Sequence, residues 1–307
     1  MKAISVLFGV FMFCHLSAQI PESKNTRFPE HADHSYKELI NYVTQAYTEK
    51  NDIAKFFYYW MAQNIQYDYA IAENLVAVHG QVTRPYALDV FESKRTICSG
   101  YAILYKLFLN EFDIECEVVD GYAKSKEGLI LSDSLEIAHT WNVVRLENTW
   151  SLVDVTWAAT TRVEEKVSPF FYRTPPELFV FNHFPFIPYW QLAEQPISLN
   201  EFRRLPEVNA EYYDLGFAAL APKLLKEDSK YKLIIGKSKE WKPIISKSLT
   251  GKEYETVQFK SKDLGNYQEL IFQADESKPF IIRLDAYQPI DWQHQVTQTQ
   301  LAYVVMQ

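Results

Sequence analysis

The 307-residue sequence has few cysteines, few glycines and no excess of positive charge. With only 3 Cys, the chain is not a disulfide-stapled scaffold. With 9 Gly and no visible repeat period, it is not a fibrous protein. Lys and Arg number 31 against 39 Asp and Glu, a formal net charge of −8, so no global basic field attracts phosphate backbones. We therefore expect no nucleic-acid partner.

What the sequence does contain is apolar and aromatic material. Hydrophobic residues make up 48% of the chain and aromatic residues 15%, which excludes a disordered protein. At about 150 residues per domain, this length predicts two folded domains, each with enough core to be stable without cross-links.

The first residues have the pattern of an export signal. Lys2 precedes an apolar run over residues 3–13, and the small residues Ser17 and Ala18 follow where a signal peptidase cuts. The run is shorter than the ~20 apolar residues of a membrane-spanning helix, and no later segment approaches that length. We predict a signal peptide over residues 1–18 and a mature protein that is exported to the periplasm, cell surface or medium, without an integral membrane segment.

The remaining chain divides into three parts that differ in composition and residue pattern. Residues 19–35 are polar and broken by proline, which predicts an extended arm. Its His31 and His34 are spaced as a metal pair, but no third ligand is near, so we interpret them as solvated side chains and expect no metal site. Residues 36–198 mix helical periodicity with strand patterns and predict an α+β domain. The end of this domain, residues 160–198, is rich in proline and aromatic residues and is expected to form an ordered strap over it.

From residue 199 onward the pattern is short strands with polar turns. This texture predicts a C-terminal all-β, sandwich-like domain over residues 199–307. The predicted strands are 231–235, 253–259, 268–273, 279–286 and 300–306.

Cys98 is the first candidate for chemistry. Apolar residues follow it at helical spacing, so it lies in the first turn of a predicted buried helix, where the helix dipole lowers the pKa of a thiol. The competing interpretation is a disulfide to Cys116. A helix between the two cysteines is ~20 Å long, whereas a disulfide requires Cα atoms within ~7 Å, so we favour a free Cys98 and a buried Cys116 thiol.

A predicted hairpin brings an imidazole and a carboxylate together. Strand patterns over 139–146 and 149–157 are separated by a two-residue turn. In that register His139 and Asp154 are diagonal neighbours on one face, with Cβ atoms about 7 to 8 Å apart. A three-residue turn without a bulge places them on opposite faces.

A thiol, an imidazole and a carboxylate are the groups that thiol acyl transfer requires. Each of Cys98, His139 and Asp154 alone is more often an ordinary buried or satisfied polar group. Together, in compatible local geometry, they predict a Cys-His-Asp triad.

The segments around these residues resemble the transglutaminase-like superfamily of papain-like thiol enzymes, in its bacterial and kyphoscoliosis-peptidase-like branch. The resemblance implies a papain-like α+β core in which Cys98 is the nucleophile, His139 the general base and acid, and Asp154 the carboxylate that orients the imidazole. The strings that carry it are NIQYDYA (64–70), CSGYAILYKLFL (98–109), VVDGYA (118–123), HTWNVVRLENTWSLVDVTW (139–157) and, more loosely, NHFPF (182–186).

The sequence identifies the hydrogen-bond donors of an oxyanion hole less clearly than it identifies the triad. The Cys98 backbone N–H is one natural donor, and in relatives of this family a Trp upstream of the cysteine provides another. Trp60 stands upstream here, but its helical spacing favours a core position. Gln63 and Tyr67 lie in the same region and are equally good candidates, and Trp141 is a further candidate for the wall of the site.

Three functions remain open at this point. The first is an exported cysteine peptidase or hydrolase that cleaves amide bonds of a protein or peptide, for example one of the cell envelope, through a thioester. The second is a transglutaminase that passes the same acyl group to an amine. The third is a non-catalytic cell-surface binding module on a papain-like scaffold. We expect no cofactor, and without acidic residues at calcium-loop spacing the calcium dependence of animal transglutaminases is not carried over.

Overall fold

The fold is known from a computed structural model that describes most of the chain. The predicted signal peptide and nearly all of the predicted arm, with His31 and His34, lie outside the described residues. Across the described ranges, no helix combines the length and apolar character needed to cross a bilayer. These ranges are residues 35–72, 85–124, 136–163, 166–217, 221–227, 230–249, 253–274, 280–289 and 295–306.

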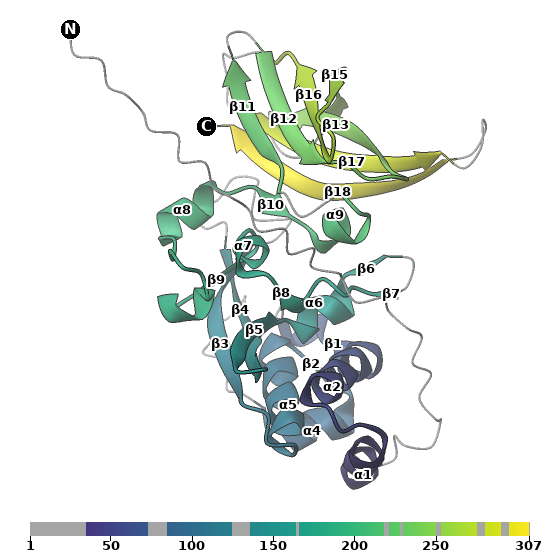
Figure 1. Ribbon diagram of the computed structural model, residues 1–307, viewed down its shortest axis with the longest axis vertical. Helices are drawn as coiled ribbons and strands as arrows, with labels where there is room; N and C mark the ends of the chain where they lie inside the picture. Colours follow the sequence, from purple (N-terminus) through teal and green to yellow (C-terminus); the bar gives the residue numbers. More distant parts are fainter. Residues whose placement is uncertain are drawn as a thin grey trace, which may run out of the picture.

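The helices described before residue 111 form one layer of the first domain (Figure 1). They are α1 (Tyr36–Ala46), α2 (Lys50–Asn64), α4 (Ala87–Ser93) and α5 (Cys98–Asn110). The helices pack through aromatic side chains: the ring of Phe57 in α2 stacks on that of Phe108 in α5 at 4.3 Å between centroids. A short parallel pair, β1 (Gln66–Tyr67) and β2 (Arg95–Thr96), leads the chain into α5. The packing of these rings holds α5, which begins at Cys98, against α2.

A five-stranded antiparallel sheet forms the second layer, in the order β8-β5-β4-β3-β9. Asn142 of β4 donates its side-chain amide to the backbone carbonyl of Ala102 in α5 at 3.0 Å, which ties the sheet to the helix. The strands are β3 (Cys116–Lys124), β4 (Glu136–Leu146), β5 (Thr149–Val153), β8 (Tyr172–Thr174) and β9 (His183–Pro185).

The hairpin of β4 and β5 has the predicted register but a shorter second strand. Leu146 pairs with Thr149, and both turn residues have positive φ, 52° for Glu147 and 61° for Asn148, as a type I′ turn requires. The predicted strand over 149–157 is wrong beyond residue 153, because Asp154 caps helix α6 (Val155–Thr160) instead of continuing the strand. Asp154 therefore lies one residue beyond the ladder, and the helix cap rather than a ladder position orients its carboxylate toward His139.

The proline-rich segment over 160–198 does more than cover the domain. Its strands β8 and β9 are the two edges of the sheet, so residues distant in sequence close it on both sides. The segment also contains the hairpin of β6 (Arg162–Val163) and β7 (Lys166–Val167), helix α7 (Pro176–Phe179) and the 3₁₀ helix η1 (Pro188–Gln191).

The rest of the chain is mainly β and forms two further sheets (Figure 1). One has the order β10-β18-β17-β13-β14 and the other β11-β12-β16-β15, and the rings of Tyr231 in β12 and Phe280 in β17 meet at 5.1 Å. The predicted fold class, a papain-like α+β core followed by all-β sheets, is confirmed. Of the predicted strand over 253–259, only β14 (Glu255–Thr256) forms. The remaining elements are α8 (Leu199–Arg204), β10 (Glu207–Val208), α9 (Ala210–Asp214), β11 (Lys223–Glu227), β12 (Lys230–Gly236), β13 (Lys242–Ser248), β15 (Lys260–Asp263), β16 (Tyr267–Phe272), β17 (Phe280–Pro289) and β18 (Gln295–Met306).

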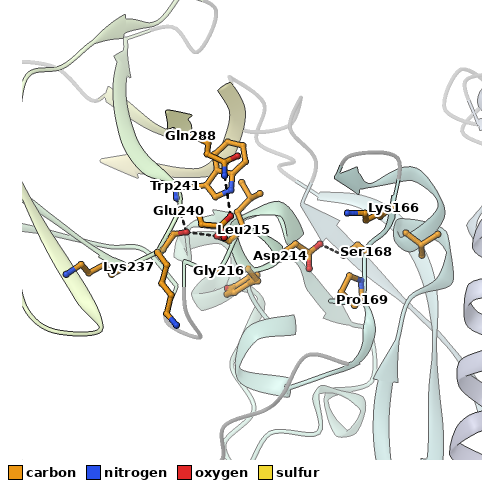
Figure 2. A pocket seen from close by; sticks show the side chains of 14 residues that line it. Lys166, Ser168, Pro169, Asp214, Leu215, Gly216, Lys237, Glu240, Trp241 and Gln288 are labelled. Carbon is orange, nitrogen blue, oxygen red and sulfur yellow. Dashed lines mark hydrogen bonds between the residues drawn. The ribbon is translucent and has the colours of Figure 1, made fainter. Parts of the chain in front are cut away.

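A cavity of about 670 Å³ lies between the first domain and the C-terminal sheets (Figure 2). Ser168 and Pro169 line one side, and Trp241 lines the other. Asp214, at the end of α9, points toward Ser168 and accepts a hydrogen bond from its hydroxyl at 2.6 Å. None of Cys98, His139 and Asp154 lines this cavity, so it is separate from the predicted triad.

Candidate active site

Cys98 is the first residue of α5 and is half-buried. The chain enters the helix through Ile97, whose backbone carbonyl accepts the N–H groups of Gly100 at 2.9 Å and Tyr101 at 3.1 Å. The first N–H groups of a helix have no intrahelical acceptor, so the Cys98 N–H points out of the helix start together with the positive end of the dipole. This is the position from which a backbone donor can stabilise an oxyanion next to the thiol.

His139 and Asp154 form a buried hydrogen-bonded pair. The Nε2 atom of His139 lies 2.8 Å from Oδ2 of Asp154, and their side chains are 4% and 0% exposed. The other carboxylate oxygen, Oδ1, accepts the Trp157 backbone N–H at 3.0 Å as the N-cap of α6. The backbone N–H of Asp154 is held by the carbonyl of Phe171 at 3.0 Å. The carboxylate is thus fixed by its own helix start before it meets an imidazole.

The thiol and the imidazole interact directly. Burial opposes ionisation of Cys98, but a hydrogen bond to His139, the charge of His139 and a backbone hydrogen bond from Thr140 together lower the pKa of the thiol. Burial likewise opposes protonation of His139, and the Asp154 carboxylate outweighs it and raises the pKa of His139 to about 10. Because Nε2 of His139 faces Asp154, Nδ1 is the nitrogen that serves Cys98. Both shifts act in the direction of a thiolate–imidazolium pair.

A second histidine, His183 of β9, completes the cluster. Its Nε2 atom lies 3.0 Å from the same Oδ2 of Asp154, and its side chain is fully buried. No sequence pattern assigns His183 a role in the site. The signal available was its place in the string NHFPF, which carries no spacing that links it to the hairpin.

The three side chains are also the kind that bind metal ions. His139, Asp154 and His183 each offer a ligand atom, and these atoms lie within 4.8 Å of one another. The separations of 2.8 and 3.0 Å to Oδ2 are those of hydrogen bonds, and a metal ion bound here would displace both protons and engage the imidazole that serves Cys98. The arrangement suits proton transfer better than metal binding.

The four other predicted site residues occupy different environments. Trp60 is fully buried, with its ring against Phe91 at 5.7 Å, and lies in the helical core. Gln63 is exposed on α2. Tyr67 interacts electrostatically with Cys98, and burial raises its pKa, so it is a neutral hydroxyl beside the thiol. Trp141 is 1% exposed, and its ring lies 6.0 Å from that of His139.

Cys116 lies away from this chemistry at the start of β3. It is a free thiol, 2% exposed, and its sulfur accepts a hydrogen bond from the Asn142 amide at 3.4 Å. Burial raises the pKa of Cys116, in contrast to Cys98. Of the two thiols, only Cys98 is activated.

A sequence profile described as the transglutaminase-like superfamily matches residues 37–155, which include Cys98, His139 and Asp154. The chain is 30% identical over 210 residues to the kyphoscoliosis peptidase of Homo sapiens and 29% identical to that of Mus musculus. These matches cover 66% of this chain but only 30% of either relative.

The cytokinesis protein 3 of Schizosaccharomyces pombe (strain 972 / ATCC 24843) is 31% identical over 120 residues, covering 38% of this chain and 14% of that protein. A solved structure titled "Crystal structure of a TGase" aligns with 47% of this chain and 37% of its own, at 20% identity and a TM-score of 0.33.

Proposed function

From the premise that this chain belongs, through its domain around residues 37–155, to the transglutaminase-like superfamily, we propose that it is a cysteine peptidase or hydrolase that cleaves amide bonds of proteins or peptides. The observation that carries the proposal is the imidazole of His139, which is hydrogen-bonded to Asp154 through Nε2 and to Cys98 through its other nitrogen, Nδ1. The name of the mammalian relatives, kyphoscoliosis peptidase, supports the same reaction class.

The reaction proceeds in two acyl transfers. The Cys98 thiolate attacks the amide carbonyl carbon, and a C–S bond forms while the oxyanion is met by the Cys98 N–H. The C–N bond then breaks, and the proton on His139 passes to the departing amine. Water attacks the resulting thioester, gives a proton to His139, and the thiolate leaves as the carboxylic acid is released. Asp154 keeps the imidazole oriented in both steps and stabilises its charged form.

A transglutaminase differs only in the second step, where a primary amine replaces water. The two outcomes are separated by offering internally quenched peptides together with a fluorescent primary amine and identifying the products by mass spectrometry. We expect free carboxylate fragments as the main product. Amine-tagged product in excess would favour the transglutaminase.

The matched variants are Cys98→Ala and Cys116→Ala. Cys98→Ala removes the nucleophile and abolishes turnover, whereas Cys116→Ala removes a thiol of the same size from β3 and leaves turnover within about twofold. Turnover that survives in Cys98→Ala would contradict the proposal. A Cys98 that iodoacetamide does not modify below pH 8 would favour a non-catalytic binding module.

We also propose that the protein is exported and meets its substrate in or outside the cell envelope. The support is the charge, apolar run and small residues of 1–18. The test is the N-terminal mass of the protein recovered from its native cells, which is expected to begin at Gln19. A chain that retains residues 1–18 in the cytoplasm would overturn it.

A further inference from the structure

Two imidazoles share one oxygen of Asp154, and the second is held as firmly as the first. His183 lies in β9 and pairs with Ala123 of β3. Its ring stacks on Phe179 at 3.9 Å and 16° between planes, and the rings of Trp157 and Trp141 lie 4.5 and 5.1 Å away. Because aromatic rings surround it, the imidazole cannot turn its other nitrogen toward the carboxylate without repacking the core.

The shared oxygen dictates where the protons are. An ionised carboxylate only accepts hydrogen bonds, so Nε2 of both His139 and His183 must carry a proton. Burial lowers the pKa of His183 to about 4, so the ring is neutral near pH 7, and the hydrogen bond to Asp154 puts its single proton on Nε2. His139 exchanges protons during the reaction, while His183 is a permanent neutral donor.

A donor that keeps its proton throughout the reaction stabilises the buried Asp154 carboxylate while His139 is neutral. The Asp154 side chain is fully buried, and an isolated buried carboxylate is strongly disfavoured. Whenever His139 has passed its proton to the leaving amine, Asp154 loses its positive partner. At that stage its charge is held by the remaining donors, among them Nε2–H of His183 on Oδ2 and the N–H of Trp157 on Oδ1.

We propose that His183 is a positioning residue that keeps Asp154 ionised and aimed at His139 throughout the catalytic cycle. The inference rests on the function proposed above and adds a fourth residue to it. His183 acts on the reaction through its hydrogen bond to Asp154 rather than as a group that reacts itself.

Several titratable groups face Asp154, and each belongs to a different element. All of these groups can contribute to the pH dependence of the site, so an effect of His183 must be separated from theirs. They are Tyr58 of α2, Tyr67 of β1, Cys98 of α5, His139 of β4 and His183 itself of β9.

The first test measures the rate of Cys98 alkylation by iodoacetamide from pH 4 to 9. His183→Phe keeps a ring in the stack but removes the donor, so Asp154 takes up a proton at higher pH and ceases to support the imidazolium. We expect the pH midpoint of the acid limb to rise by about one unit, about a tenfold loss of rate on that limb. His183→Gln retains an N–H donor, so we expect its pH midpoint to return most of the way to the wild-type value.

Phe179→Leu is the matched packing control, because it loosens the stack on His183 without removing a hydrogen bond to Asp154. It lowers the melting temperature and leaves the acid limb in place. An acid limb in His183→Phe that coincides with wild type, or one that moves equally in Phe179→Leu, would overturn the role of His183.

The second test does not depend on the thiol. In ¹⁵N-histidine-labelled Cys98→Ala protein, with the His183 signal assigned through His183→Phe, we expect the Nε2–H tautomer to persist down to about pH 5. A His183 that carries its proton on Nδ1, or that titrates near 6.5, contradicts the inference whether or not the protein is an enzyme. An unreactive wild-type Cys98 with a neutral Nε2–H His183 contradicts the proposed function alone.

Discussion

Asp154 satisfies three demands with two oxygens. Oδ1 caps α6, and Oδ2 accepts from His139 and His183. A side chain with so many fixed partners has one usable rotamer, so the orientation of the imidazole is set before substrate binds. The position of the Asp154 carboxylate is therefore set by the hydrogen bonds to its two oxygens rather than by the strand that precedes it.

Asp154→Asn separates these demands. Asn is as good a helix cap as Asp, so α6 is expected to remain, but an amide nitrogen in place of Oδ2 opposes two imidazole donors or forces His139 into the wrong tautomer. We expect kcat/KM to fall by about 10² to 10⁴ and Cys98 alkylation at pH 6 to fall in parallel. Far-UV circular dichroism checks the fold, and exposed Asp89→Asn on α4 is the control. Unchanged kcat/KM in Asp154→Asn would remove the carboxylate from the mechanism.

At the scale of single residues, the sequence predicted the contacts that form within one hairpin or next to it. His139 and Asp154 are 15 residues apart and are brought together by a two-residue turn that sequence patterns reveal. His183 is 29 residues beyond Asp154 on the opposite edge of the sheet, and its contact depends on the order of strands, which local periodicity does not encode. Trp60 was assigned a core position by its helical spacing, and it lies there.

At the scale of the element, the start of α5 is fitted closely to β2. A Cβ atom added to Gly100 would lie 1.8 Å from Oγ1 of Thr96 and 2.7 Å from its Cβ. Thr96 is buried and pairs with Tyr67, so it has little room to move. The absence of a side chain at residue 100 lets the strand enter the helix at Cys98.

Gly100→Ala is therefore expected to destabilise the protein by about 2 to 3 kcal/mol, because overpacking outweighs the helix propensity of alanine. Thermal unfolding measures the loss. Adding Thr96→Gly to Gly100→Ala removes the obstructing atoms and should recover part of the lost stability, which a general helix effect would not.

Ser99→Ala in the same turn is the control. Its hydroxyl is buried and has no hydrogen-bond partner among the described residues, so we expect no loss of stability. A stable Gly100→Ala would contradict the close fit.

The boundaries of elements were the least predictable feature. The alternating pattern of residues 149–157 is compatible with a strand to its end, yet α6 starts at Val155 because Asp154 caps it. A carboxylate at the end of a strand pattern is equally consistent with a strand residue and a cap, and only tertiary contacts decide between them. The start of α5 at Cys98 was predictable, since a long apolar period defines it.

At the scale of the whole molecule, the C-terminal sheets are tied to the active-site region. Asn182, next to His183, donates its side-chain amide to the carbonyl of Val208 and accepts the Val208 N–H at 3.2 Å. Val208 is in β10, which pairs with β18 through Ala302. The strand that carries His183 is therefore fixed from both domains, which gives the C-terminal part a supporting role in the geometry of the site.

The cavity between the two parts contains a group whose ionisation should govern how stability depends on pH. Burial raises the pKa of Asp214 to about 7, partly offset by the hydrogen bond from Ser168. Its Oδ1 atom is buried, and no group in the described part of the chain forms a hydrogen bond with it. In the unfolded chain an Asp titrates near 3.9, so the folded state binds this proton more tightly. The contribution of Asp214 is fully favourable below about pH 4 and is lost as pH rises to about 7.

Asp214→Asn keeps the shape of the protonated acid but cannot ionise. Relative to wild type, we expect its free energy of unfolding to be unchanged at pH 4 and higher at pH 8 by about 1 to 3 kcal/mol, below the limit of about 4 kcal/mol that the shift sets. Chemical denaturation at both pH values measures the difference, in which the titrations of His183 and Asp154 cancel. Exposed Asp113→Asn should show no such divergence. If the pH dependence of Asp214→Asn parallels that of wild type, the carboxylate is ionised and solvated in the cavity, and the packing between the two parts does not depend on its protonation.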